Sequence, residues 1–190
     1  MRAFIAIDLP QATKYALAGL QDQLREAEAD VKWVAPQNIH LTLKFLGEIN
    51  AGQVSKISAI IEDVASDNPD FTLRINSLGA FPRIDYLRVI WVGLDKGDAQ
   101  IKKIARELEE KIEKIGIPKE DRPFSSHITI ARTRSNKNRQ KLILDLKKLS
   151  EGFKLDDSEF KAGKITLFKS DLSPKGPTYE VLKSANLKTT

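Results

Sequence analysis

The chain has 190 residues and no cysteine, so it is long enough for one compact domain, while a disulfide framework, a thiolate zinc site and a thiol nucleophile are excluded. Its longest apolar runs are strand-sized, far short of the roughly 20 residues of a membrane span, and its start lacks a signal peptide, so we expect a cytoplasmic protein with no membrane partner. The 31 Lys and Arg residues against 26 Asp and Glu give a formal charge of +5, a modest excess that favours polyanionic partners.

The first half of the sequence alternates strand and helix patterns. An apolar run over residues 4–9 predicts a strand, and Pro10 at the first helical position opens a helix with apolar residues at helical spacing up to residue 27. Residues 39–46 alternate and end at Gly47, which predicts a second strand. Asn50 and Gln53 fit a capping box for a helix that runs to Pro69, and residues 71–75 return to a strand pattern.

The second half repeats this order. The pattern predicts a strand over 87–92, a helix through Ile115 that ends at Gly116, and a strand over 126–131. A helix with leucines at 142, 146 and 149 ends at Gly152, and short strands are predicted at 153–155, 164–168 and 179–182. These elements predict the α+β class with antiparallel-rich sheets.

The spacing of the elements indicates an internal duplication. Phe4 and Val89, His40 and His127, and Phe71 and Phe153 lie 85, 87 and 82 positions apart. We therefore expect one domain over 1–190, built as a two-lobed duplicated unit. Its repeats are approximately 1–86 and 87–170, followed by C-terminal strands in 171–190, with the sheets lining a central cleft and the helices outside.

The two histidines of the chain stand in matching His-x-Thr patterns, one in each repeat. Because side chains alternate along a strand, His40 and Thr42 share one face, and His127 and Thr129 do the same. If the lobes face each other, two imidazoles and two hydroxyls converge. A single motif is typical of an ordinary strand, but two at matched positions that use every histidine indicate a catalytic site.

This set of side chains suits phosphoryl transfer. In-line displacement at phosphorus needs a base and an acid on opposite sides of the phosphate, and two imidazoles can divide these roles at neutral pH. A threonine hydroxyl can donate to a non-bridging oxygen. The scheme needs no metal and no other cofactor, and two imidazoles with two threonines make a poor zinc ligand set.

At these residues the sequence resembles the two-histidine (2H) phosphoesterase superfamily, and within it the RNA 2′,3′-cyclic phosphodiesterase family, historically called 2′-5′ RNA ligases. The resemblance covers nearly the whole chain and is carried by residues 2–7, 40–48, 79–82, 127–132 and 167–170, of which 79–82 has the pattern of a turn. Many relatives carry a proline directly before the second histidine, where this chain has Ser126.

The resemblance implies hydrolysis of a terminal 2′,3′-cyclic phosphate to a 2′-phosphomonoester, with cleavage of the P–O3′ bond. By the same resemblance His127 is the proton acceptor that activates water, and His40 is the proton donor to O3′. The residues alone do not order these roles, because the motifs are nearly symmetric. The implied partners are RNA ends or oligonucleotides with a cyclic phosphate, tRNA among them, and a monomer is expected.

Three further residues are candidates for substrate binding. Arg132 matches the arginine after the family's second motif, although strict alternation from His127 puts it on the core face unless a bulge intervenes. Lys44 shares a face with His40 by strict alternation and would add positive potential, or it is an ordinary surface lysine. Phe45, like Trp33, either stacks on a base or belongs to the core.

Two rival functions stay open at this level. The first is 2′-5′ RNA ligation, which is the same reaction in reverse and which a comparison of ligated with hydrolysed product would separate. The second is an RNA-binding module without turnover, which would need no paired acid and base.

Overall fold

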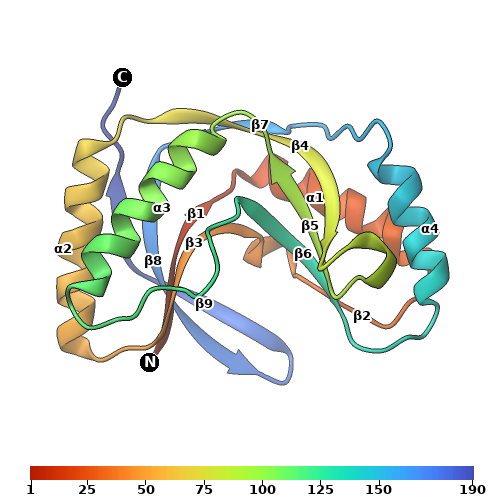
Figure 1. Ribbon diagram of the computed structural model, residues 1–190, viewed down its shortest axis with the longest axis horizontal. Coiled ribbons are helices and arrows are strands. Elements are labelled where there is room, and N and C mark those ends of the chain that lie inside the picture. The colour runs from red at the N-terminus through yellow and green to blue at the C-terminus, as the bar shows by residue number, and fades with distance from the viewer.

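The computed structural model describes residues 1–190 as four α-helices, two short 3₁₀ helices and nine strands in two sheets (Figure 1). In chain order the elements are β1 Arg2–Asp8, α1 Gln11–Arg25, β2 Val31–Trp33, η1 Pro36–Asn38, β3 His40–Glu48, α2 Ala51–Asp67, β4 Phe71–Phe81, η2 Ile84–Tyr86, β5 Val89–Leu94, α3 Asp98–Glu113, β6 His127–Thr133, α4 Arg139–Ser150, β7 Glu159–Ala162, β8 Lys164–Ser173 and β9 Gly176–Asn186. None of the helices has the length and apolar character that crossing a membrane requires.

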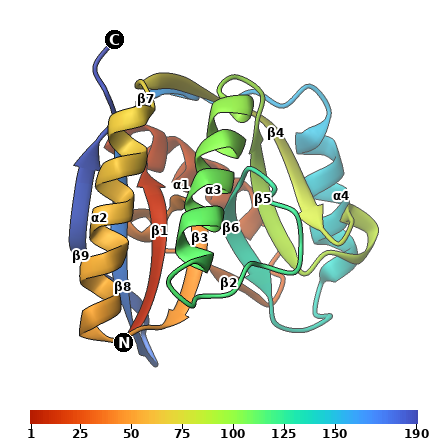
Figure 2. The ribbon, with the colours of Figure 1, turned by 60° about the vertical axis from the view of Figure 1, so that its left-hand side comes forward.

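The first sheet has the strand order β3-β1-β8-β9, and all its ladders are antiparallel. Helices α2 and α3 pack side by side against it (Figure 2). Strand β1 is central and buried on both faces, which is why it has an almost continuous apolar run. Asn50 caps α2 with the expected reciprocal bonds to Gln53.

The second sheet has the order β2-β6-β5-β4-β7, again with antiparallel ladders. Helix α1 packs against β6 and α4, and α4 packs against β4. The two sheets with their helices form the two sides of the molecule in Figure 1. The predicted α+β class with antiparallel sheets and outer helices is therefore confirmed.

Each sheet contains strands from both halves of the sequence. Strand β4 belongs to the first half but lies in the second sheet, beside β5, and β8 belongs to the second half but lies in the first sheet, beside β1. Helix α1 likewise packs on the second sheet, whereas α3 packs with α2 and β3. The division into repeats at residues 86 and 87 thus stays a prediction about sequence, since the spatial lobes draw on both halves.

One apolar core joins the lobes. A single cluster of 41 buried residues includes Ile5 and Leu41 from the first sheet together with Ile90 and Ile128 from the second. Burial of this contiguous apolar surface is the main stabilising contribution, so the lobes are two parts of one folding unit.

Two predicted segments differ from the structure, and one strand has no counterpart among the predictions. The strand expected at 153–155 is wrong: these residues form no strand, and β7 lies at Glu159–Ala162. The segment 79–82 is not a simple turn, because Phe81 is the last residue of the long strand β4. The short strand β2 was not predicted, since three residues show too little alternation to be recognised.

Candidate active site

The two histidines occupy the same place in their strands. His40 is the first residue of β3 and lies opposite Asp8, and His127 is the first residue of β6 and lies opposite Gly93. Both side chains are half-buried. Each sheet therefore presents one imidazole at the start of an equivalent strand.

Backbone carbonyls orient both rings in the same way. Nδ1 of His40 lies 2.7 Å from the carbonyl oxygen of Asn38, and Nδ1 of His127 lies 2.8 Å from that of Ser125, in each case two residues upstream. A carbonyl only accepts, so Nδ1 carries the proton in both rings. Each Nε2 is then left with a lone pair for chemistry when the ring is neutral.

Both orienting carbonyls are themselves held in place. The side-chain amide of Asn38 donates to the carbonyl of Pro177, at the start of β9, over 2.8 Å. On the other side, the hydroxyl of Ser126 donates to Asp98 in the first turn of α3. Ser126 stands where many relatives have proline, and this hydrogen bond fixes the loop before His127.

The environment favours the neutral form of both imidazoles. Burial lowers the pKa of His40, against the opposing effects of the Asn38 carbonyl and the negative charge of Asp8. Burial also lowers the pKa of His127, where the Ser125 carbonyl opposes it and the positive charge of Arg132 adds to it. The larger charge effect at His40, from Asp8, thus raises its pKa, whereas the charge effect at His127, from Arg132, lowers its pKa.

Aromatic side chains form the walls around the imidazoles. The ring of His40 is stacked on Phe4 with centroids 4.7 Å apart, and Tyr179 of β9 meets it edge-on at 5.4 Å. The ring of His127 meets Phe81 edge-on at 5.0 Å. The spacing of the His-x-Thr motifs does not indicate these aromatic residues. Phe4 could have been found, because alternation along β1 places it on the same face as Asp8, which pairs with His40.

A β-bulge follows each His-x-Thr motif and changes which residues face the site. In the β1–β3 ladder the register shifts after Thr42, and in the β5–β6 ladder it shifts after Thr129. The extra residue moves the next side chains to the opposite face. The structure therefore contains the bulge that Arg132 required, and it places Arg132 on the face of His127 and Thr129.

The bulge in the β1–β3 ladder makes the expectation for Lys44 wrong. Lys44 pairs with Ile5 on the core face, its side chain is 0% exposed, and its ammonium lies 2.6 Å from Glu109 of α3. It also donates to the carbonyl of Pro118 over 3.2 Å. Lys44 thus fastens α3 and the following segment to β3 and does not reach a substrate.

Phe45 and Trp33 lie in different surroundings. Phe45 pairs with Phe4 on the site face and is 55% exposed, so its assignment to the core is wrong. Trp33 packs against the apolar core and is covered by the Arg25 guanidinium at 4.8 Å. Of the two, only Phe45 is available to a ligand at the site.

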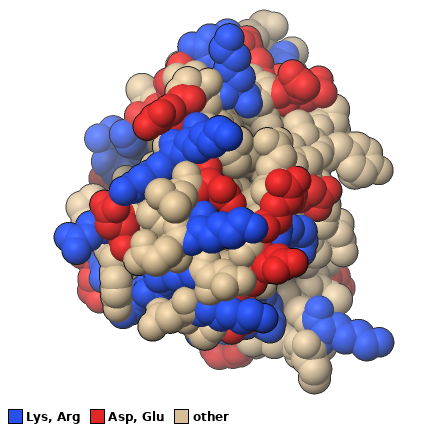
Figure 3. Space-filling model, turned by 90° about the vertical axis from the view of Figure 1, so that its right-hand side faces the viewer, with Lys and Arg blue, Asp and Glu red and all other residues tan.

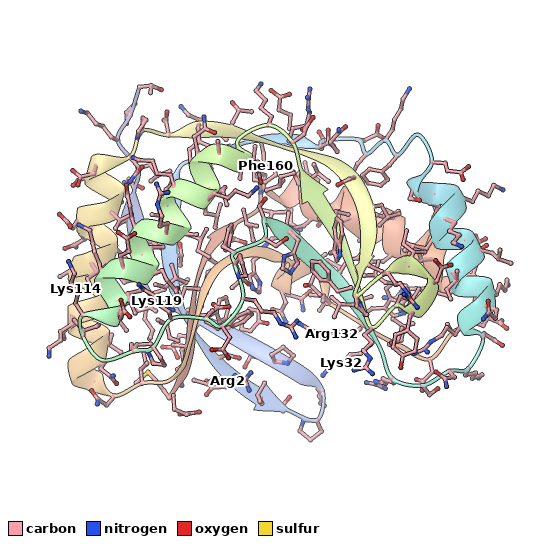
Figure 4. All side chains as sticks on the ribbon, viewed as in Figure 1. Arg2, Lys32, Lys114, Lys119, Arg132 and Phe160 are labelled. Carbon is pink, nitrogen blue, oxygen red and sulfur yellow. The ribbon has the colours of Figure 1, made fainter.

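Arg132 connects the neighbourhoods of the two histidines. Its charge lowers the pKa of His127, and it also opposes the rise in pKa that burial gives Tyr179. Tyr179 in turn touches His40. Figure 4 shows Arg132 beside the β8–β9 hairpin that carries Tyr179. Strands β3 and β6, which begin at the two histidines, also contact each other, so the two imidazoles belong to one region of the molecule.

The structure has two sizeable hollows. One of about 510 Å³ begins at Asp8, opposite His40, and extends past Phe168 and Thr166 on the first sheet. The other, of about 440 Å³, lies between α3 and residues 119–124. No group of three or more His, Cys, Asp or Glu side chains is placed to hold a metal ion. Neither histidine lines either hollow, and the first one approaches the candidate site only through Asp8, the strand partner of His40.

Comparison with known proteins gives consistent results over the whole chain. The family model described as LigT like Phosphoesterase matches twice, over residues 7–91 and 92–179. RNA 2′,3′-cyclic phosphodiesterase from Methanocaldococcus jannaschii is 36% identical over 183 residues, which are 96% of this chain and 99% of that protein.

Solved structures with the same fold cover equally long stretches. The crystal structure of TT0787 from Thermus thermophilus matches with a TM-score of 0.83 and 29% identity, covering 100% of this chain and 99% of that one. The structure of E. coli LigT complexed with 3′-AMP matches with a TM-score of 0.78 and 26% identity, covering 98% and 97%. Sequence and fold thus point to the same group of proteins.

Proposed function

The chain belongs to the LigT like phosphoesterases, and from this membership we propose that it hydrolyses RNA 2′,3′-cyclic phosphates to 2′-phosphomonoesters by metal-independent acid–base catalysis with His40 and His127. The observation that carries the proposal is the matched pair of imidazoles, each with Nδ1 bonded to a carbonyl and Nε2 left for proton transfer. The name of the archaeal relative and the 3′-AMP complex of LigT support a nucleotide substrate.

In this reaction water attacks the phosphorus in line with O3′. Nε2 of the base takes a proton from the water as the new P–O bond forms, and the acid gives a proton to O3′ as the P–O3′ bond breaks. The phosphate stays on O2′ as a monoester. The base ends protonated and the acid neutral, so an exchange of protons with solvent restores both.

Charge asymmetry supports His127 as base and His40 as acid. Asp8 favours a protonated His40, as a proton donor requires, with a smaller opposing effect from Lys14. Arg132 favours a neutral His127, as a proton acceptor requires. The neighbouring charges therefore supply an order that the nearly symmetric motifs do not.

The remaining site residues hold the phosphate and the nucleoside. Thr42 and Thr129 share the faces of their histidines, and we assign their hydroxyls to non-bridging phosphate oxygens, with the Arg132 guanidinium balancing the negative charge. Phe45 offers an exposed ring for a base. Lys44 has no part in this scheme.

The test is conversion of a short RNA ending in a 2′,3′-cyclic phosphate by the purified protein in excess chelator. We expect a 2′-phosphate product, and losses of about 10²- to 10⁴-fold for His40→Ala and for His127→Ala with unchanged thermal melting. Full activity of either variant, or activity lost with the chelator, would refute the mechanism. Ligated product in the same assay would reveal the reverse reaction, and binding without turnover would indicate an RNA-binding module.

A further inference from the structure

Three exposed cations near the site have no partner within the protein. Arg2, Lys32 and Arg132 are exposed and take part in none of the ion pairs that hold many of the other basic side chains. By contrast, on the side that α4 covers, Lys and Arg lie interspersed with Asp and Glu (Figure 3). The positive charge of the three residues is thus available to a ligand.

Strand register places all three on the site face. Lys32 of β2 lies directly across from Arg132 of β6, and opposed residues in an antiparallel ladder project to the same side. Arg2 is two residues before Phe4 on β1, so it shares the face on which Phe4 stacks against His40. The cations come from both sheets and border one surface.

The three residues lie around the same hairpin, β8–β9 (Figure 4). Both Arg132 and Arg2 oppose the burial-induced rise in the pKa of Tyr179, so both lie near that ring. Lys32 and Arg132 are neighbours in the ladder. Figure 4 shows Arg132 and Lys32 close together beside the end of the β8–β9 hairpin and Arg2 over the hairpin itself. We call Arg2 and Lys32 the basic rim.

We propose that the basic rim binds the phosphodiesters of the RNA strand that leads to the cyclic phosphate, so that the preferred substrate is an oligonucleotide rather than a mononucleotide. This inference rests on the proposed function, in which Arg132 contacts the terminal phosphate. A single-stranded RNA that leaves the site has a phosphate for each further nucleotide, and unpaired cations at the border of the site match that repeated charge.

Contacts of the basic rim should be recognisable from the salt dependence of kcat/KM, because they are made only by substrates with upstream phosphodiesters. Each phosphate bound by a cation adds about −0.7 to the slope of log kcat/KM against log salt for a single strand. A mononucleotide 2′,3′-cyclic phosphate has no upstream phosphodiester. The rim should therefore make the salt dependence steeper for the oligonucleotide only.

The experiment measures kcat/KM from about 50 to 200 mM salt for uridine 2′,3′-cyclic phosphate and for a tetranucleotide ending in the same group. We expect Arg2→Ala and Lys32→Ala each to lower the tetranucleotide value by about 2- to 3-fold at the low-salt end and to flatten its slope by about 0.7. The change should lie in KM, the mononucleotide should be unaffected, and Arg2→Lys should restore the slope.

Lys114→Ala is the matched control, because it removes one exposed lysine from the far side of the molecule (Figure 4). The proposal is refuted if kcat/KM falls equally for both substrates, falls for neither, or falls by the same factor in the control. It is also refuted if the unaltered protein gives equal salt slopes for the two substrates. If the unaltered protein hydrolyses neither substrate, the proposed function itself fails.

Discussion

Removal of Glu109 tests the buried ion pair that joins α3 to the strand of His40. Lys44 has a fully buried side chain whose ammonium lies 2.6 Å from Glu109, and its other partner is the carbonyl of Pro118 at 3.2 Å. Glu109→Ala therefore leaves a buried positive charge with one neutral acceptor. Breaking a buried pair in this way costs about 3–5 kcal/mol, which lowers the Tm of a protein of this size by roughly 6 to 20 °C.

Substitution of the other partner, Lys44, should lower the free energy of unfolding by less. In Lys44→Met the Glu109 carboxylate loses the ammonium, but it is 22% exposed and still accepts the backbone N–H of Glu120 over 2.5 Å. We expect a loss of about 1–2 kcal/mol, because water and this hydrogen bond partly compensate the charge. The double variant should be more stable than Glu109→Ala alone, since no buried charge is left.

Urea unfolding of the unaltered protein, the two single variants and the double variant closes a thermodynamic cycle for this pair. The order of stability is the decisive result. If Glu109→Ala is within about 1 kcal/mol of the unaltered protein, or if Lys44→Met is the less stable single variant, the ammonium is not buried as the structure has it.

Three further predictions concern the site. Because burial lowers the pKa of both histidines, kcat/KM for a small cyclic nucleotide should peak below pH 6.5. The value should rise as the base loses its proton and fall as the acid loses its proton. Asp8→Asn should move the falling limb of this profile to lower pH, and an unmoved limb would contradict the role of the Asp8 charge. Asn38→Ala removes the hydrogen bond that holds the turn before His40, so kcat should fall about 10- to 100-fold with little change in KM and in Tm. A clear fall in Tm together with the loss of activity would instead indicate a structural role for Asn38. Gly79→Ala would put a Cβ atom 2.6 Å from the indole of Trp91, and unfolding should show a loss of about 1–3 kcal/mol; an unaltered stability would mean that the indole moves freely.

Features that depend on local pattern could be predicted from the sequence. The helices follow from apolar periodicity, and the capping box of Asn50 and Gln53 is present as expected. The shared face of each histidine with its threonine follows from alternation over two residues, too short a distance for an irregularity to intervene. The α+β class also follows, because it needs only the type and order of the elements.

Features that depend on pairing between distant strands could not be predicted. A bulge is a property of two paired strands, so alternation within β3 alone predicts the wrong face for Lys44, and alternation within β6 predicts the right face for Arg132 only if a bulge is added. A bulge after both copies of the motif predicts Lys44 on the core face and Phe45 on the site face, as observed. The carbonyls that orient the histidines are backbone groups, which no side-chain pattern reveals.

The exchange of strands between the sheets has a consequence during synthesis on the ribosome. Strand β1 is synthesised about 160 residues before its partner β8, as the pairing of Ala6 with Thr166 shows. At roughly 5–20 residues per second, the nascent chain waits about 8 to 32 seconds before the first sheet can close. Until then the imidazole of His40 also lacks its contact with Tyr179, so a growing chain has no complete site before β9 has been made.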